Sequence, residues 1–160
     1  MAKNVVIAPA SSGDAETIAA ILLDAFREFE PLYTPGGFRA TTPTASEIAA
    51  RLPEGPAWIA TIDGQPVGTV AALRQGDEVY VRSMAVTPAA RGAGVAAALL
   101  DEVTRFSIEA GARRLRLSTT PFLHGAIRLY ERAGFERLPA PLDLHGTPLF
   151  AMTKDLRRDQ

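Results

Sequence analysis

Hydrophobic residues follow two periods along this chain, one typical of helices and one typical of strands. The clearest helical stripe predicts an amphipathic helix; its apolar positions are Val95, Leu99, Val103, Phe106 and Ala110. A second stripe from Ile18 to Phe29 predicts a helix that ends before Pro31, because proline disfavours helical geometry in the preceding residue. A further helix is expected at about 123–133, closed by Gly134 as its C-cap.

Short runs rich in β-branched and aromatic residues predict the strands. These runs cover 4–8, 57–62, 67–73, 78–86, 115–119, 135–138 and 147–155. Asp63-Gly64 stands between the second and third runs and favours a tight hairpin turn. A short helix is expected from Thr44 to about Arg51, because Thr44 and Glu47 have the spacing of a capping box.

Two segments carry turn-forming residues in place of a clear period. Residues 31–43 (PLYTPGGFRATTP) are rich in proline, glycine and aromatics, which predicts an irregular connection between two helices. Such connections are often functional, and Tyr33 and Phe38 suit the wall of a substrate site, so both interpretations stay open. Residues 139–146 are predicted to form a proline-rich loop between the last two strands.

The order of these elements predicts one α/β domain over residues 1–160. Along the chain it is β-α-α-β-β-β-α-β-α-β-β, with a mixed, mostly antiparallel central sheet flanked by helices. The strand at 78–86, the helix after it and the strand at 115–119 should form a parallel crossover. A chain of this length can bury about two-thirds of its unfolded surface.

Composition excludes several classes of function. The net charge of −1, from 17 basic and 18 acidic residues, argues against a nucleic acid or an anionic membrane as the main partner. Cysteine is absent, which removes disulfides, thiolate nucleophiles and cysteine zinc sites. Two isolated histidines, His124 and His145, without clustered carboxylates predict no metal site. No apolar run reaches membrane length and no signal pattern is present, so a cytoplasmic protein is expected.

The stretch between the strand at 78–86 and the long helix has the chemistry of an anion site. Its residues, Arg91, Gly92, Ala93, Gly94, Val95 and Ala96, are expected to form the first turn of the helix. A helix N-terminus carries unpaired N–H groups and a partial positive charge, and small residues let a ligand reach the backbone. Arg91 would add a fixed charge. These residues alone equally allow a turn whose small side chains serve only close packing.

Two familiar phosphate motifs fit this stretch poorly. The pattern G-x-x-x-x-G-K-[ST] of a P-loop is absent. Residues 92–97 match the looser G-x-G-x-x-[GA] of dinucleotide-binding folds, which require an acidic residue at the end of the next strand. The strand at 115–119 ends without Asp or Glu, and antiparallel strands are expected after it. Binding of NAD is therefore a distant alternative.

Two motifs together resemble GNAT-family acyltransferases (GCN5-related N-acetyltransferases). Arg91-x-x-Gly94-x-Ala96, preceded by Met84-Ala85-Val86-x-Pro88, is similar to the acetyl-CoA motif [QR]-x-x-G-x-[GA] of this family. Downstream, residues 126–136 (AIRLYERAGFE) are similar to the family's A-I-x-L-Y-x-x-x-G-F. The motifs occur in the family's order and spacing, and the resemblance extends over nearly the whole chain.

The resemblance implies an acetyl-CoA site. The turn over 91–96 would hold the pyrophosphate with its backbone. In the family, the strand before the turn splays from the next parallel strand, and the pantetheine arm pairs with it. Here that segment is Met84, Ala85 and Val86, with a backbone N–H near Val86 polarising the thioester carbonyl. Tyr130 corresponds to the family's general acid beside the sulfur; the alternative is a core aromatic.

The sequence departs from the family pattern in two places. An asparagine commonly precedes the tyrosine by seven residues and contacts the cofactor arm, but this chain has Leu123 there, with His124 as a candidate replacement. Many relatives have a glutamate as general base where this chain has Tyr80. The alternative bases are Glu28, Glu30 and Glu78. The sequence does not choose among them.

These observations predict an N-acetyltransferase that moves an acetyl group from acetyl-CoA to a primary amine of a small molecule or peptide by direct attack. The alternative is a catalytically weak acyl-CoA-binding sensor, which the missing asparagine and the missing base favour. A short acyl group other than acetyl also stays open, as does a homodimer. The near-neutral charge gives no bias toward a highly charged acceptor, and its identity is not predicted.

Overall fold

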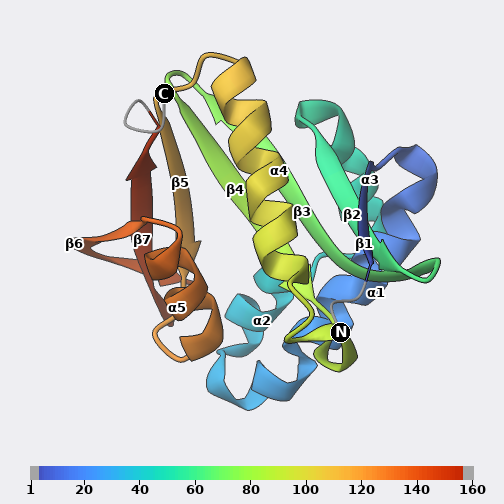
Figure 1. Cartoon of the computed structure of the whole chain (residues 1–160). Coiled ribbons are helices and arrows are strands. Elements are labelled where there is room, and N and C mark those ends of the chain that lie inside the picture. Colours follow the sequence, from blue (N-terminus) through green and yellow to red (C-terminus); the bar gives the residue numbers. More distant parts are fainter. Residues whose placement is uncertain (1–3, 157–160) are drawn as a thin grey trace.

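A seven-stranded sheet forms the centre of the computed structural model, which describes residues 4–156 (Figure 1). Its strand order is β1-β2-β3-β4-β5-β7-β6. The strands are β1 (Val5–Pro9), β2 (Ala57–Ile62), β3 (Gln65–Gln75), β4 (Glu78–Val86), β5 (Arg114–Thr119), β6 (Glu136–Leu144) and β7 (Thr147–Asp155). The helices are α1 (Ala15–Phe26), α2 (Pro35–Thr41), α3 (Ala45–Arg51), α4 (Val95–Glu109) and α5 (His124–Arg132). Short 3-10 helices are η1 (Ser12–Asp14), η2 (Arg27–Leu32), η3 (Leu52–Glu54) and η4 (Pro88–Ala90).

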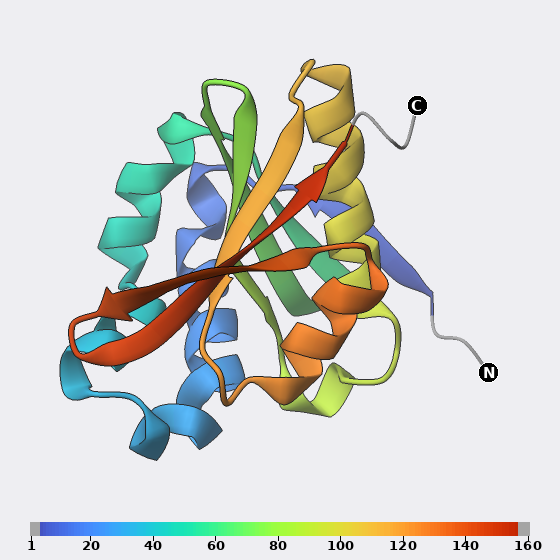
Figure 2. The ribbon, with the colours of Figure 1, turned by 90° about the vertical axis from the view of Figure 1, so that its left-hand side faces the viewer.

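Helices cover both faces of the sheet. The side view shows α4 and α5 on one face and α1, α2 and α3 on the other (Figure 2). The larger apolar core lies on the α4 side and includes Leu99, Val103 and Leu115. A smaller core, which includes Ile18 and Leu22, lies under α1 and α3. The amphipathic stripes of α1 and α4 are therefore buried against opposite faces of the sheet.

All neighbouring strands are antiparallel except one pair. β4 and β5 run parallel, and the other five pairings are antiparallel. The predicted mixed α/β fold is thus confirmed, as is the parallel unit β4-α4-β5. The hairpin turn is also confirmed, since Asp63 and Gly64 have φ values of 52° and 79°. Thr44 and Glu47 form the predicted capping box, with N–H to oxygen distances of 3.0 and 3.2 Å.

β4 and β5 pair only over their first halves. The paired residues are Glu78–Tyr80 of β4 and Arg114–Arg116 of β5. Beyond them the two strands diverge toward the end of the sheet where α4 begins, and no further pair joins them although both lie within the described residues. The backbone groups on the facing edges therefore have no strand partner. Such groups need some other partner, such as water or a ligand.

A bulge changes the direction of β4 in its unpaired half. The register between β3 and β4 shifts between Thr69 and Ala71, and Ser83 has a φ of 57°, in the left-handed region that non-glycine residues rarely adopt. Because of this extra residue, the side chains of β4 that follow the bulge point to the opposite face of the sheet from the one that the alternation before it predicts. Val81 belongs to the core on the α4 side, whereas Ala85 belongs to the core under α1.

Gly68 of β3 lets the start of α4 lie close to the sheet. A Cβ atom at this position would lie 2.8 Å from Val95 Cγ1, 3.0 Å from Leu99 Cδ1 and 3.1 Å from the Ala85 carbonyl oxygen. Val95 and Leu99 are among the most deeply buried residues of the chain. The first two turns of α4 are therefore fixed beside the end of β4.

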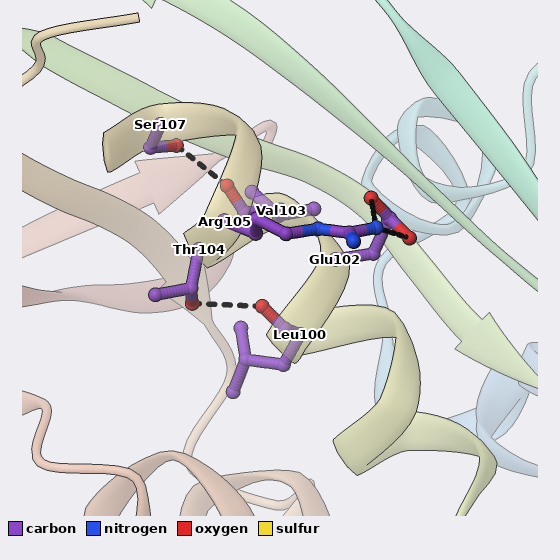
Figure 3. A network of polar contacts seen from close by, with 6 residues as sticks. All are labelled: Leu100, Glu102, Val103, Thr104, Arg105 and Ser107. Atoms are coloured by element: carbon purple, nitrogen blue, oxygen red, sulfur yellow. Dashed lines mark hydrogen bonds and ion pairs between the residues drawn. The ribbon is translucent and has the colours of Figure 1, made fainter. Parts of the chain in front are cut away.

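The middle of α4 satisfies its polar side chains within the helix (Figure 3). The hydroxyls of Thr104 and Ser107 each donate to the carbonyl four residues earlier, at 2.8 and 2.7 Å. Glu102 and Arg105 form an ion pair at 2.5 Å on the same helix. Ser107 is fully buried, so its internal hydrogen bond avoids an unsatisfied hydroxyl in the core.

The connection predicted over 31–43 is wrong in part, because it contains a helix. α2 starts at Pro35, a favoured first residue. The Thr34 hydroxyl caps it by accepting a hydrogen bond from the Gly37 N–H at 3.0 Å. The preceding helix is shorter than predicted: α1 ends at Phe26, and the 3-10 helix η2 follows it.

The loop predicted over 139–146 is also wrong. β6 runs through it as far as Leu144 and pairs with β7. Proline is tolerated at 139 and 141 because β6 is an edge strand, where one side of the backbone needs no ladder partner. The register shifts between Arg137 and Pro141, so the strand is irregular at its prolines.

We expect Gly68→Ala to lower the free energy of unfolding by about 1–3 kcal/mol, because the added methyl group overpacks the contact between β3 and α4. Gly125→Ala is the matched control, since a Cβ there meets nothing within 4 Å. The control should be neutral or slightly stabilising, by up to ~1 kcal/mol, as helix propensity predicts. Urea unfolding measures both. Wild-type stability of Gly68→Ala would show that α4 does not depend on this close approach.

Candidate functional site

The chain between β4 and α4 forms an open backbone turn. Gly92 and Gly94 both have a φ of 84°, and Gly94 is the N-cap of α4. The prediction that the helix begins at Arg91 is therefore wrong: it begins at Val95, because left-handed residues interrupt helical geometry. A Cβ atom on either glycine would meet nothing within 4 Å. The space beside the turn is open to a ligand.

The N–H groups at the start of α4 have no side-chain cap. Gly94 supplies no side chain, and its cap position makes no side-chain hydrogen bond. The first N–H groups of an α-helix also lack partners within the helix. Here they belong to Val95, Ala96 and Ala97, and Ala93 is half-buried beside them. The turn therefore presents unpaired donors and a partial positive charge to open space, as an anion site requires.

Arg91 ties the turn to the end of α1. Its Nη1 lies 2.5 Å from Glu28 Oε1, and its Nη2 donates to the Ala25 carbonyl at 3.0 Å. The guanidinium carbon also lies 5.8 Å from the centre of the Phe29 ring. The side chains of Arg91 and Glu28 are 42% and 47% exposed, so this ion pair is weak and open to solvent. The predicted charge at the turn is present, but it is paired with Glu28.

The end of β4 runs into this turn. Met84 and Val86 are half-buried and pack against the core on the α4 side, and Ala85 is buried under α1. All three residues lie beyond the last pair between β4 and β5. Their edge toward β5 has no strand partner within residues 4–156. An extended ligand can add to such an edge as a strand does.

Tyr130 lies on the buried face of α5. It is 7% exposed, and the centre of its ring lies 5.7 Å from that of Phe135. Burial raises the pKa of Tyr130 above the usual value of a tyrosine, and Tyr80 adds to the rise. The hydroxyl therefore stays protonated at neutral pH. Tyr80 belongs to β4 and Tyr130 to α5, which follows β5, and the two are close enough for Tyr80 to contribute to this rise.

The position of the family's asparagine carries no polar side chain here. Leu123 is half-buried at the N-cap of α5 and provides no cap hydrogen bond. His124 is the first residue of α5 and is exposed. Within the described range its side chain makes no hydrogen bond, so its predicted contact with the cofactor stays a prediction.

The candidate bases lie in different environments. Glu78 begins β4 and faces an arginine of β5 at 3.9 Å. Glu28 is held in the ion pair with Arg91, and Glu30 is exposed in η2. Tyr80 is half-buried and is the candidate that acts electrostatically on Tyr130. These surroundings do not identify Glu28, Glu30 or Glu78 as the general base.

Four aromatic side chains gather beside the end of β5. The centre of the Tyr33 ring lies 4.9 Å from that of Phe122 and 6.0 Å from that of Phe38. Phe29 stacks on Phe122 at 6.3 Å. Burial raises the pKa of Tyr33, against the opposing effect of nearby threonine hydroxyls. The segment over 31–43 is therefore packed against the rest of the fold, with the half-buried Phe38 at its surface.

Hydrogen bonds join the start of α2 to the turn between β6 and β7. The Thr34 N–H donates to Thr147 Oγ1 at 2.9 Å, and the Thr34 hydroxyl donates to the His145 carbonyl at 2.8 Å. A Cβ atom on Gly37 would clash with Thr147, and one on Gly36 would lie 2.9 Å from His145 Cβ. His145 has a φ of 50° in this turn. Its backbone thus has a packing role.

Neither a metal-binding cluster nor a membrane-spanning helix occurs in the described part of the chain. Between residues 4 and 156, no cluster of three or more histidine or acidic side chains is arranged to hold a metal ion. None of the helices in that range is both long enough and apolar enough to span a membrane.

A family model matches more than half of this chain. The model described as "Acetyltransferase (GNAT) family" matches residues 18–135. This chain belongs to the GNAT acetyltransferase family. The resemblance inferred from the turn motif and the Tyr130 motif is thereby confirmed, and both motifs lie within the matched range.

Curated GNAT relatives match about half of this chain. The N-acetylaspartate synthetase of Danio rerio is 39% identical over 83 residues, which cover 51% of this chain and 29% of that protein. The uncharacterized N-acetyltransferase YjgM of Escherichia coli (strain K12) is 36% identical over 93 residues, which cover 56% of each chain. This chain thus spans about half or less of the length of both relatives.

A solved GNAT structure matches the whole fold. The PaiA N-acetyltransferase from Thermoplasma acidophilum, in complex with coenzyme A, superposes with a TM-score of 0.78. The match covers 95% of this chain and 99% of that chain, with 16% sequence identity. At this identity the likeness establishes the GNAT fold.

Sequence reasoning missed three features of this region. The bulge at Ser83, the ion pair between Arg91 and Glu28, and the hydrogen bond from Arg82 to Glu54 at 2.9 Å were not predicted. The two pairs join residues 63 and 28 positions apart, and no local pattern signals such contacts. A serine within a β-rich run likewise gives no sign of a bulge.

Proposed function

We propose that this GNAT family member transfers an acetyl group from acetyl-CoA to the primary amine of a small acceptor. One observation carries the proposal: the uncapped start of α4 and the unpaired end of β4 lie at the same end of the sheet. The first suits a pyrophosphate, and the second suits an extended amide-bearing arm. Coenzyme A contains both groups, and the Thermoplasma acidophilum relative was solved with coenzyme A.

The turn would hold the pyrophosphate mainly through its backbone. The residues assigned to this role are Arg91, Gly92, Ala93, Gly94, Val95 and Ala96. Open space beside Gly92 and Gly94 supports the assignment, because a phosphate must reach the N–H groups without meeting a side chain. Exposed ion pairs contribute only about 0–1 kcal/mol, so a pyrophosphate can compete with Glu28 for the Arg91 guanidinium.

The thioester would lie in the gap between β4 and β5. Met84, Ala85 and Val86 are assigned to the pantetheine arm, and a backbone N–H near Val86 is assigned to the thioester carbonyl oxygen. The neutral amine attacks the carbonyl carbon, a C–N bond forms, and the C–S bond breaks. The departing thiolate accepts a hydrogen bond from the Tyr130 hydroxyl, and a proton from solvent water completes the free thiol. The proton that the amine loses goes to solvent water, because no carboxylate stands at the family's base position on β4, where this chain has Tyr80.

The raised pKa of Tyr130 limits how much its hydroxyl can assist the departure of the thiolate. A hydroxyl that stays protonated is available as a donor throughout the neutral range. A thiol is more acidic than a phenol, so full transfer of the proton to the thiolate is uphill. Tyr130 therefore acts mainly by hydrogen bonding to the developing charge on sulfur.

The acceptor side of the gap is assigned to the segment from η2 to α2. Its aromatic cluster provides a partly apolar wall. The name of the Danio rerio relative describes an acetylated amino acid, which supports an acceptor that carries an amine on a small molecule. An acyl-CoA sensor is the second candidate, favoured by Leu123 in place of a polar side chain. Release of free thiol from acetyl-CoA with a panel of amines separates an enzyme from a sensor.

We expect Gly94→Glu to abolish measurable binding of acetyl-CoA in a calorimetric titration. A carboxylate at this position would project into the open space of the turn and repel the pyrophosphate. Gly76→Glu is the matched control, since Gly76 also has a positive φ, of 64°, but lies in the β3–β4 turn. The control should bind as the wild type does. Wild-type binding by a folded Gly94→Glu protein would contradict the assignment of the turn.

We expect Tyr130→Phe to slow acetyl transfer by about 10²-fold, the low end of the range for general acids, because the thiol is itself acidic. Affinity for acetyl-CoA should barely change, since the turn that binds the pyrophosphate is elsewhere. Steady-state and single-turnover kinetics give the rate, and thermal melting checks the fold. Near wild-type turnover by the folded variant, with chemistry limiting the rate, would leave Tyr130 as a core aromatic.

A further inference from the structure

A small hollow on the α1–α3 face of the sheet has no role in the proposed transfer of the acetyl group. It lies between α1, α3 and strands β2 to β4. Ile18, Ile48 and Leu52 form much of its apolar lining, and Arg51 and Arg82 line it as well. Its free volume of about 20 Å³ is close to that needed for a single water. Only the head group of a ligand can therefore enter it.

Arg82 brings unused hydrogen-bond donors to this hollow. Its side chain is 22% exposed, so most of it is covered by protein. Among residues 4–156 its side chain makes one hydrogen bond, from Nη2 to Glu54 Oε1 at 2.9 Å. A guanidinium has five N–H donors in a planar fork that matches a carboxylate. A mostly covered guanidinium with free donors is suited to a small anion, and Arg51 adds a second cation.

Arg82 also stands close to the reacting groups. Alternate residues of a strand share a face, so Arg82 and Tyr80 lie on the same side of β4, about 6.5–7 Å apart along the strand. Tyr80 in turn is close enough to Tyr130 to help raise its pKa. The bulge at Ser83 directly follows Arg82, and Met84 begins the segment assigned to the cofactor arm. A small molecule held at Arg82 can thus extend to the thioester.

We infer that Arg82 binds a carboxylate of the acceptor, so that the acceptor is a small amine that also carries a carboxylate, such as an amino acid. The inference rests on the proposed acetyltransferase function. One oxygen of a carboxylate is about the size of a water and can enter the hollow, where it can use the donors of Arg82 that Glu54 leaves free. An acceptor with a second cation in place of the carboxylate would be repelled by Arg51 and Arg82.

The test compares alanine, leucine and phenylalanine with their α-amides as acceptors, by thiol release from acetyl-CoA. We expect Arg82→Gln to lower kcat/KM for the amino acids about 10- to 100-fold and to change it less than about twofold for the amides, given the usual strength of hydrogen bonds between charged groups. Dividing variant by wild-type values for each acceptor removes the difference in basicity between an amino acid and its amide. Arg82→Lys keeps the charge without the fork and should give an intermediate loss.

Glu54→Gln separates binding from structural support. It removes the same ion pair but leaves Arg82 in place, so activity toward the amino acids should be kept or increased. A purely structural ion pair would instead make Arg82→Gln and Glu54→Gln alike, with equal losses for amino acids and amides. Arg105→Gln controls for the loss of one positive charge and should match the wild type, since the Arg105 side chain is 64% exposed and pairs with Glu102 of the same helix (Figure 3).

The outcomes distinguish this inference from the proposed function. Equal losses for acids and amides in Arg82→Gln and Arg82→Lys would overturn the carboxylate site and leave the acetyltransferase proposal intact. The same conclusion would follow if the wild-type protein acetylated phenylethylamine but none of the amino acids. Absence of thiol release with every amine would overturn both.

Discussion

The early end of the ladder between β4 and β5 is the constraint on which the rest of this structure depends. Parallel pairing stops at Tyr80, while β4 continues to Val86 with β3 as its only strand partner within the described residues. Unpaired backbone groups are unfavourable in a protein interior unless water or a ligand reaches them. The bulge at Ser83 and the left-handed N-cap at Gly94 lie toward the same end. Irregular backbone of this kind persists where surrounding packing enforces it, and it is concentrated at functional sites.

Contacts from several elements fix the two edges of the gap between β4 and β5. On one side, Gly68 seats α4 against β3, and Arg91 joins the turn to α1. On the other, Thr34 fastens the start of α2 to the β6–β7 turn, and the aromatic cluster rests on Phe122 after β5. The gap is therefore framed by regular elements that belong to both faces of the sheet. A cofactor arm that enters it meets a preformed edge, so little ordering of the protein opposes binding.

Local patterns predicted the elements whose structure is decided locally. The stripe of α4 from Val95 to Phe106, the Asp63-Gly64 turn and the capping box of α3 depend on residues a few positions apart, and all were confirmed. Errors arose where distant residues decide the outcome. α2 depends on Thr34, whose partner Thr147 is 113 positions away, and β6 keeps its prolines because it is an edge strand. The same holds for the site: motifs located the turn and Tyr130, but the partners of Arg91 and Arg82 come from other elements and are visible only in the fold.

The central claim is that the unpaired end of β4 and the turn before α4 together bind acetyl-CoA. Hydrogen–deuterium exchange of the wild-type protein, with and without saturating acetyl-CoA, tests it most directly because it reports on backbone amides. The account predicts slower exchange in peptides that cover 84–86 and 92–97, with no change at the Asp63-Gly64 hairpin. Unchanged exchange in both segments at saturating acetyl-CoA, or protection confined to other parts of the chain, would contradict it.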